Sequence, residues 1–447
     1  MKFKFSRSFG ALAASLMLAG CFATAEKAPA SDQLTKIQPS QALSGDYLLV
    51  DSRSPDAFNG WTKNKDAASG HLPSAELLSA RWINWQLDLD AAIARLEVKK
   101  DQKIAVYGET DLQRETVAKR LIAEKNISAE QVFEVTGEFS QWGKNFELQK
   151  LQGFQTLVPA SYIESRIGKA VIVQIGWDGG KGKDYRKSHI PGAIYWDDIE
   201  FEMPPIWEAR PVEVIRTALE KIGIDKNSEV IVYSSDPMGS TRGGAIMQYA
   251  GVENVKVLNG TFDTWKKLEM PLEKGWNQPQ SIENFGVTGE GDSTVIINIE
   301  QAKQLRKQPN SALVSVRSLP EFYGEISGYG YFDKKGRIPG ALNAPSGPKG
   351  SWDMSNYRNP DQTMRWQASL QNFLDQNNIS KEMNISYYCG SGWRAAEVWW
   401  YTRAMGFENA SIYSSGWMRW SSEASNPISK GTINKPQILD KQQALSK

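Results

Sequence analysis

The segment Ile385-Ser-Tyr-Tyr-Cys389-Gly-Ser-Gly-Trp-Arg394 decides the fold class of this chain. Its first four residues form an apolar run typical of a buried strand, and the helical pattern of Arg394 to Met405 follows directly. Strands that alternate with helices in this way predict an α/β fold, a parallel sheet with helices on both faces. Cys389 therefore stands where a strand ends and a helix begins, which is the edge at which open α/β sheets bind ligands.

The same pattern occurs three times along the 447 residues. Each copy has an opening apolar strand, a turn with a small apolar step, a second apolar strand, and a closing aromatic residue with a Trp three positions later, an order that indicates three tandem repeats. The opening strands are expected at Tyr47–Asp51, Val171–Ile175 and Ala312–Val316, and the turns at Gly70–Ala75, Ser188–Ala193 and Gly336–Ala341. The second strands are expected at Lys103–Tyr107, Val230–Tyr233 and Ile385–Tyr388, and the closing pairs are Phe139/Trp142, Phe262/Trp265 and Trp417/Trp420. Helices are expected at Glu115–Glu124, Val212–Ile222 and Arg394–Met405.

Three α/β domains also agree with the length, because a domain usually takes about 100–200 residues. We expect them at residues 35–151, 152–277 and 290–430, with a C-terminal tail at 431–447. The stretch from Asn277 to Ser293 is polar, contains Gly and has no strand pattern, so it reads as a linker. A hydrophobic content of 40% with 23% charged residues is that of an ordinary globular protein. The net charge of +1 offers no field to attract a polyanion, so nucleic acid is not an expected partner. Separately, we expect the protein to be a monomer.

Residues 1–34 read as a signal peptide and tether. Lys2, Lys4 and Arg7 precede the apolar stretch Phe9 to Gly20, which suits a secretory signal and is too short for a membrane span. The end of this stretch, Leu18 to Cys21, resembles a bacterial lipobox, in which Cys21 would be lipidated. We therefore expect a periplasmic protein held to a bacterial membrane by its lipid alone. Cleavage after Ala25, releasing a soluble protein, is the alternative.

The chain has two cysteines, Cys21 and Cys389, so Cys389 has no partner for a disulfide once Cys21 is lipidated or removed. An unpaired Cys can be a buried, inert residue, but the local sequence favours a reactive one. Gly390 and Gly392 let the backbone fold tightly around a small anion, and the N-terminus of the following helix stabilises a thiolate. Arg394 ends the loop and adds a positive charge.

The loop from Cys389 to Arg394 resembles the active-site loop of the rhodanese family, and the turns and closing Trp residues resemble that family over nearly the whole folded chain. The resemblance extends to exported three-domain bacterial sulfurtransferases. It implies that Cys389 is the nucleophile and carries a persulfide, and that no cofactor is needed. The N–H cradle is expected from Gly390, Ser391, Gly392, Trp393 and Arg394.

The first and second copies carry Gly108 and Ser234 at the position of Cys389, so we interpret them as inactive rhodanese-like domains, the second of which walls the active-site cleft. The third copy also departs from the family. Ser315 stands for an expected Asp, and Arg337 for the His of the turn; a substrate-binding role and a surface ion pair are both open for Arg337. Arg317 is expected to pair with Glu321, and the His residues of the other turns, His71 and His189, are expected to fix those turns.

Other classes fit less well. A cysteine hydrolase needs a base such as His, a thioredoxin-like protein needs a second Cys, and a metal site needs more ligands, none of which accompanies Cys389 in the third copy. Related phosphatases have five residues between Cys and Arg, whereas this loop has four. The donor stays open: the start of the loop resembles 3-mercaptopyruvate sulfurtransferases, and Arg394 favours thiosulfate. The acceptor would be cyanide or a thiol. A non-catalytic protein that carries persulfide or binds an anion is the alternative from another class.

Overall fold

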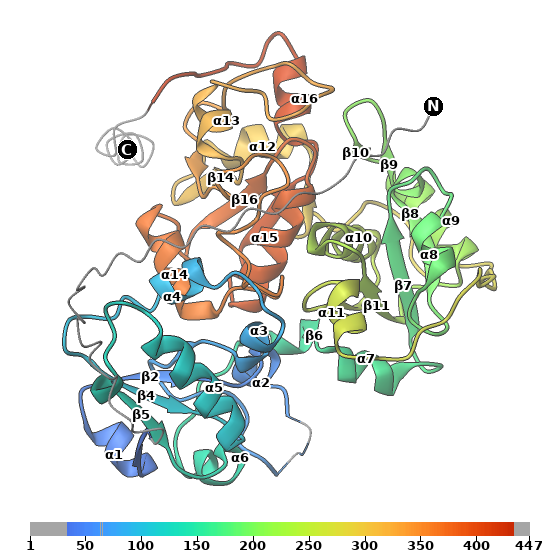
Figure 1. Ribbon diagram of the computed structural model, residues 1–447. Coiled ribbons are helices and arrows are strands. Elements are labelled where there is room, and N and C mark those ends of the chain that lie inside the picture. Colours follow the sequence, from blue (N-terminus) through green and yellow to red (C-terminus); the bar gives the residue numbers. More distant parts are fainter. Residues whose placement is uncertain (1–33, 63, 65, 433–447) are drawn as a thin grey trace, which may run out of the picture. The chain divides into compact units, whose positions relative to one another are not determined.

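Three five-stranded parallel sheets organise the chain in the computed structural model, which describes residues 34–62, 64 and 66–432 (Figure 1). The strand orders are β1-β5-β4-β2-β3, β6-β12-β11-β7-β8 and β13-β17-β16-β14-β15. In each sheet the five strands, taken in chain order, have the same spatial order 1-5-4-2-3, so the three repeats share one topology. The three α/β domains expected from the sequence are confirmed.

The first domain is built from short elements around its central strands. Its strands are β1 (Thr35–Ile37), β2 (Tyr47–Asp51), β3 (Glu76–Leu77), β4 (Lys103–Tyr107) and β5 (Val132–Val135). Its helices are α1 (Pro39–Ser44), α2 (Pro55–Asn59), α3 (Ala80–Asn84), α4 (Asp90–Ala94), α5 (Asp111–Ile122) and α6 (Phe139–Trp142).

The second domain adds a small hairpin, β9 (Glu202–Met203) with β10 (Glu208–Ala209), to its parallel sheet. The sheet strands are β6 (Leu157–Val158), β7 (Val171–Gly176), β8 (Ile194–Asp197), β11 (Glu229–Tyr233) and β12 (Asn254–Leu258). The helices are α7 (Ala160–Arg166), α8 (Lys183–Lys187), α9 (Val212–Lys221), α10 (Pro237–Ala250) and α11 (Phe262–Lys267). No helix or strand lies between Asn277 and Ser293, in agreement with the expected linker.

The third domain has a long, mostly irregular segment between α13 and α14. Its strands are β13 (Ile296–Ile297), β14 (Ser311–Ser315), β15 (Leu342–Asn343), β16 (Asn384–Tyr388) and β17 (Ala410–Tyr413). Its helices are α12 (Ile299–Leu305), α13 (Leu319–Tyr323), α14 (Gln367–Gln376), α15 (Trp393–Ala404) and α16 (Gly416–Ser422).

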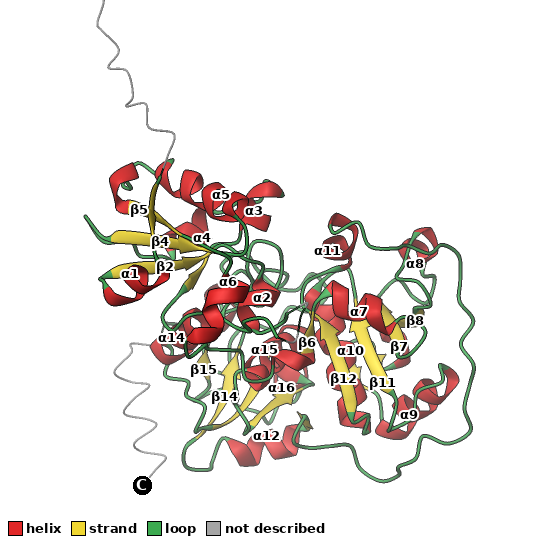
Figure 2. Cartoon of the chain, turned by 90° about the horizontal axis from the view of Figure 1, so that it is seen from below, coloured by secondary structure: helices red, strands yellow, loops and turns green. Residues whose placement is uncertain are grey.

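Both faces of the sheets are covered, because alternate residues of one strand belong to different apolar clusters (Figure 2). On β14, Val314 packs into the cluster that contains α14 and α15, whereas Leu313 packs into the cluster with α12 and α16. The first of these clusters also contains one face of the core of the second domain, and α10 and α15 join the two domains there. Gly244 of α10 permits this approach, since a Cβ there would lie 3.0 Å from the Trp400 ring.

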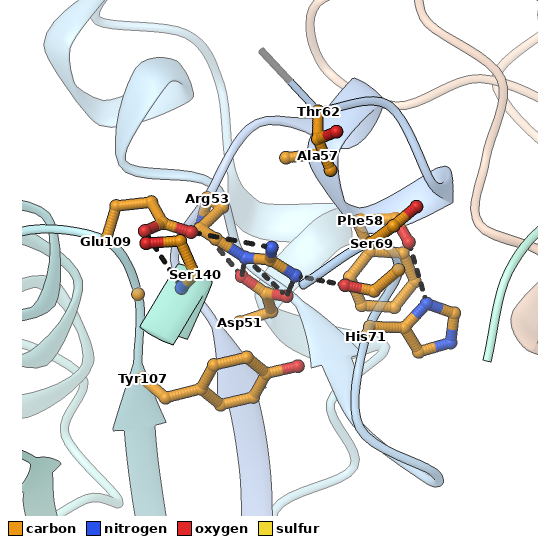
Figure 3. A network of polar contacts seen from close by, with 12 residues as sticks. Asp51, Arg53, Ala57, Phe58, Thr62, Ser69, His71, Tyr107, Glu109 and Ser140 are labelled. Atoms are coloured by element: carbon orange, nitrogen blue, oxygen red, sulfur yellow. Dashed lines mark hydrogen bonds and ion pairs between the residues drawn. The ribbon is translucent and has the colours of Figure 1, made fainter. Parts of the chain in front are cut away.

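The turn after the opening strand is fixed in the same way in all three domains. His71 Nδ1 is 2.8 Å from the carbonyl oxygen of Phe58, and His189 Nδ1 is 2.8 Å from that of Tyr185 (Figure 3 shows the first). These contacts confirm that both His residues fix their turns. Arg337 takes the place of the imidazole in the third domain and donates from Nη1 to the carbonyl of Phe322 at 3.3 Å.

A buried arginine follows the opening strand in the first and third domains. Arg53 binds the Asp51 carboxylate and donates to the carbonyl oxygen of Gly70 (Figure 3). Arg317 donates to the equivalent carbonyl of Gly336 at 2.8 Å, and its Nε lies 3.4 Å from Glu321 Oε1, which confirms the expected pair. Glu321, on α13, thus replaces the carboxylate that Ser315 does not supply.

No helix among the described residues is long and apolar enough to cross a membrane. The expected signal peptide, lipobox and Cys21 lie outside the described residues, as does most of the C-terminal tail.

Candidate active site

Cys389 directly follows β16 and precedes α15, as expected. The loop is held from the closing helix α16: the Trp417 N–H donates to the Cys389 carbonyl at 2.8 Å, and the Met418 N–H donates to the Gly390 carbonyl at 3.1 Å. The Cys389 thiol is 2% exposed, and the Gly392 N–H donates to its Sγ at 3.2 Å. A backbone dipole at the helix N-terminus therefore points at the sulfur, where it favours negative charge.

Both glycines of the loop are required by their surroundings. A Cβ on Gly390 would lie 2.3 Å from the Tyr329 ring, and Gly392 has a φ of +100°, in the left-handed region. Only glycine allows Tyr329 to approach the loop this closely while the chain turns into α15.

Cys389 opens onto a cavity of about 420 Å³, called here the Cys389 cavity. Four of its residues come from the second domain: Trp177, Asp198, Trp207 and Met238. The remainder come from the third domain: Gly328, Tyr329, Gly330, Tyr331, Ser351, Trp352, Cys389, Ser391, Trp393 and Arg394. The expectation that the second domain walls the cleft is confirmed. Of the expected cradle, the side chains or backbone of Ser391, Trp393 and Arg394 line the cavity, whereas Gly390 and Gly392 lie in the loop behind it.

Arg394 lines the cavity, but its positive charge is paired with the Glu321 carboxylate. Its Nη1 and Nη2 donate to the two carboxylate oxygens of Glu321 at 2.9 and 2.8 Å, and Nη2 also donates to the Tyr329 hydroxyl at 2.6 Å. Burial by itself would raise the pKa of Glu321, but Arg394 and Arg317 outweigh it and lower that pKa to about 2. Glu321 is therefore ionised, and its charge is shared by two buried guanidinium groups.

The structure does not bring Arg337 to the cavity. Besides its bond to Phe322, its Nη1 donates to the Gly431 carbonyl at 2.7 Å, and the guanidinium lies 5.0 Å from the centre of the Phe322 ring. Both roles expected for Arg337, a substrate contact and a surface ion pair, are therefore wrong. Arg337 fixes the turn as His71 and His189 do in the other domains, because a guanidinium can donate to the equivalent backbone carbonyl.

The other two copies use the position of Cys389 for packing. A Cβ on Gly108 would lie 2.1 Å from Ser52 Oγ, which leaves no room for a thiol. The Ser234 hydroxyl accepts from the Ser240 N–H at 3.0 Å and donates to the Asp236 carbonyl. Asp236 caps α10 and binds Arg358 Nη2 of the third domain at 2.7 Å, an interdomain role that sequence reasoning missed.

The aromatic lining of the cavity was also missed. Trp417 and Trp420 are fully buried and pack in the core, whereas Trp352 is 63% exposed. Tyr331 at the same cavity is 59% exposed. Two large exposed aromatics in the segment between α13 and α14 are the signal that could have indicated a binding site.

Comparison with known proteins matches a family model, the Rhodanese-like domain, to residues 37–145, 162–268 and 298–423. Thiosulfate sulfurtransferase YnjE of Escherichia coli (strain K12) is 35% identical over 398 residues, covering 86% of this chain and 88% of YnjE. The 3-mercaptopyruvate sulfurtransferase of the same organism is 23% identical over 256 residues, covering 56% of this chain and 86% of that protein.

Solved structures agree with this match. The crystal structure of YnjE superimposes with a TM-score of 0.83 at 32% identity, covering 94% of this chain and all of that chain. A structure of EanB in complex with ergothioneine gives a TM-score of 0.81 at 30% identity, covering 90% of this chain and all of that chain. Within the described residues, no cluster of His, Cys, Asp and Glu side chains could hold a metal ion.

Proposed function

We propose, since the chain belongs to the rhodanese family, that it moves a sulfane sulfur from thiosulfate to a thiophilic acceptor through a persulfide on Cys389. Similarity to YnjE over most of both chains supports sulfurtransferase activity. The observation that carries the residue assignment is that Cys389 lines a cavity and that the Gly392 N–H donates to its sulfur.

The proposed reaction needs no external oxidant. The Cys389 thiolate attacks the outer sulfur of thiosulfate, the new S–S bond forms, and sulfite leaves with the electron pair of the broken bond. The acceptor, cyanide or a thiolate, then attacks the outer sulfur of the persulfide. Sγ leaves as a thiolate, and the Gly392 N–H is placed to stabilise its charge in both steps.

Thiosulfate as donor rests on the similarity to YnjE, and it is distinguished from 3-mercaptopyruvate in one cyanide assay. We expect kcat/KM for thiosulfate to exceed that for 3-mercaptopyruvate by at least about tenfold, a difference of about 1.4 kcal/mol in transition-state stabilisation. The reverse preference would assign the chain to 3-mercaptopyruvate. Release of no more than about one sulfur per protein chain would instead indicate a persulfide carrier without turnover.

An acceptor larger than cyanide is favoured by the cavity itself. Its volume of about 420 Å³ lies in the range usual for small-molecule sites, far above the need of a two-atom anion. EanB has been solved with bound hercynine and with bound ergothioneine, and one of its structures holds a cysteine persulfide with ergothioneine. These complexes show that a chain of this architecture can bind an organic molecule.

We further propose that the protein is periplasmic and tethered by a lipid on Cys21, which the basic start and the lipobox-like Leu18–Cys21 support. Expressed in Escherichia coli, the wild type is expected in the membrane fraction of osmotically shocked cells. The Cys21→Ser variant cannot be lipidated, so no mature lipoprotein should be found in its membrane fraction. Release of the wild type with the soluble periplasmic contents would favour cleavage after Ala25 instead.

A further inference from the structure

Aromatic rings dominate the Cys389 cavity. Three indoles follow one another along its wall: the Trp177 ring lies 5.4 Å from that of Trp393 in an edge-on contact and 6.4 Å from that of Trp352. The rings of Tyr329 and Tyr331 lie 5.9 Å apart on the same cavity. The polarisable faces of such rings attract organic cations, indole most strongly.

Trp207 adds a sixth aromatic side chain under backbone strain. It lies in the connection between β9 and β10 with a φ of +56°, a left-handed conformation that is rare for a bulky residue. Strain of this kind concentrates at ligand sites, where the surrounding structure holds a side chain in a required place.

The ionisable groups around the cavity also favour a cation once Asp198 is ionised. Asp198 lines the wall, is 6% exposed and forms no ion pair within the described part of the chain. The guanidinium on the wall, Arg394, is bound by Glu321. Arg242 does not line the cavity and is paired with Glu202 at 2.6 Å, and Glu202 in turn accepts from Trp393 Nε1. Among the described residues that line the cavity, Asp198 is thus a carboxyl group outside any ion pair, and the one guanidinium, Arg394, has a carboxylate partner.

We propose that the sulfur acceptor of this protein is an organic cation carrying a thiol, whose ammonium group is held by the indoles of the Cys389 cavity and by Asp198. This inference rests on the proposed function and names the class of its acceptor. The acceptor thiolate attacks the outer sulfur of the Cys389 persulfide. One S–S bond forms, the original one breaks, and Sγ leaves as a thiolate, so the product is the persulfide of the acceptor.

The state of Asp198 gives this cavity a pH dependence. Burial, followed by the neighbouring charges of Glu202 and Asp197, raises the pKa of Asp198 to about 8. Near pH 7 the carboxyl is mainly protonated, and a bound cation would favour its ionised form. Cation binding is therefore expected to release protons at pH 7 and to tighten as the pH rises towards about 8, where the effect levels off.

Binding can be measured apart from sulfur transfer by calorimetric titration of the Cys389→Ser variant. The probes are choline and its neutral isostere 3,3-dimethylbutan-1-ol, which differ in one positive charge. We expect choline to bind at least about tenfold more tightly, with proton release detected by repeating the titration in buffers of different ionisation enthalpy. Equal affinities would overturn the proposal.

Turnover is tested with thiocholine and its neutral isostere 3,3-dimethylbutane-1-thiol as acceptors of sulfur from thiosulfate. A higher kcat/KM for thiocholine, compared at equal thiolate concentration, supports the inference. If both thiols are used equally well while cyanide is also used, the cation site is wrong but the sulfurtransferase proposal stands. If no acceptor is used, the proposed function itself fails.

Three substitutions assign the effect to residues. Trp352→Leu removes an aromatic ring but keeps apolar bulk, whereas Trp352→Phe keeps a ring, so choline affinity should fall several-fold more in the first. Asp198→Asn should weaken choline binding above pH 8 and abolish the proton release. Leu112→Ala is the control, because Leu112 is 70% exposed on α5 in the first domain and does not line the cavity. Equal affinity in Trp352→Leu and Trp352→Phe would exclude a role for that ring.

Discussion

Cys389→Ser is expected to lower thiosulfate:cyanide sulfurtransferase activity by a factor on the order of 10⁴ or more, the range seen when a covalent nucleophile is removed. Serine has nearly the same shape, and the hydroxyl can accept the Gly392 N–H, so the loop should keep its conformation. The oxygen, however, cannot hold a transferable sulfane sulfur. Mass spectrometry of the wild type after incubation with thiosulfate should find one added sulfur on the peptide that contains Cys389.

Unchanged near-ultraviolet circular dichroism and an unchanged unfolding midpoint would show that the Ser variant is folded. Activity within tenfold of the wild type in such a folded variant would remove Cys389 from the mechanism. Alkylation of the wild type offers an independent control, because blocking the thiol should inactivate the protein.

Glu321→Ala is expected to cost about 3–5 kcal/mol of stability, because it leaves two buried guanidinium groups without their carboxylate. Arg317 and Arg394 are each at most 2% exposed, so water cannot replace the lost partner without rearrangement of the loop. The measurement is the urea-induced unfolding transition followed by tryptophan fluorescence. Asp263→Ala is a matched control, because the Asp263–Lys266 pair is largely exposed and should contribute no more than about 1 kcal/mol. Similar losses in the two variants would mean that the Glu321 network is solvated.

The same carboxylate gives a pH dependence of definite sign. Its pKa of about 2 in the folded chain lies below the value of about 4.3 expected for an unfolded Glu. Its contribution to stability is therefore fully present above about pH 4.3 and is lost as the pH falls through about 2. In Glu321→Gln, stability should decline less steeply across this window than in the wild type.

Many helices and strands of the fold could be predicted from the local pattern of apolar residues in the sequence. The predicted strands Tyr47–Asp51 and Lys103–Tyr107 are β2 and β4 residue for residue, and the predicted helix Arg394–Met405 differs from α15 by one residue at each end. The edge strands β6 and β13 were missed because each has two residues, too few for any alternation to be recognised. Such strands form because a sheet edge is available to them, which is a tertiary cause.

The Cys389 loop could be predicted because strand, glycines and helix follow one another in the sequence. Its surroundings could not. Whether Arg394 faces a substrate depends on Glu321, which lies 73 residues earlier and whose carboxylate also serves Arg317. Trp177 and Trp207 reach the cavity from another repeat, and no spacing along the chain relates them to Cys389.

The shared cavity has a consequence for how this chain can change over evolution. Cys389 belongs to one repeat, whereas four residues of the surrounding wall belong to a repeat that carries Ser234 at the equivalent position. Mutations at Trp177 or Trp207 can therefore alter the compounds that enter the cavity without changing the Cys389 loop. A repeat that supplies part of the wall but no thiol is free to diversify the ligands of its neighbour, which gives selection a reason to retain it.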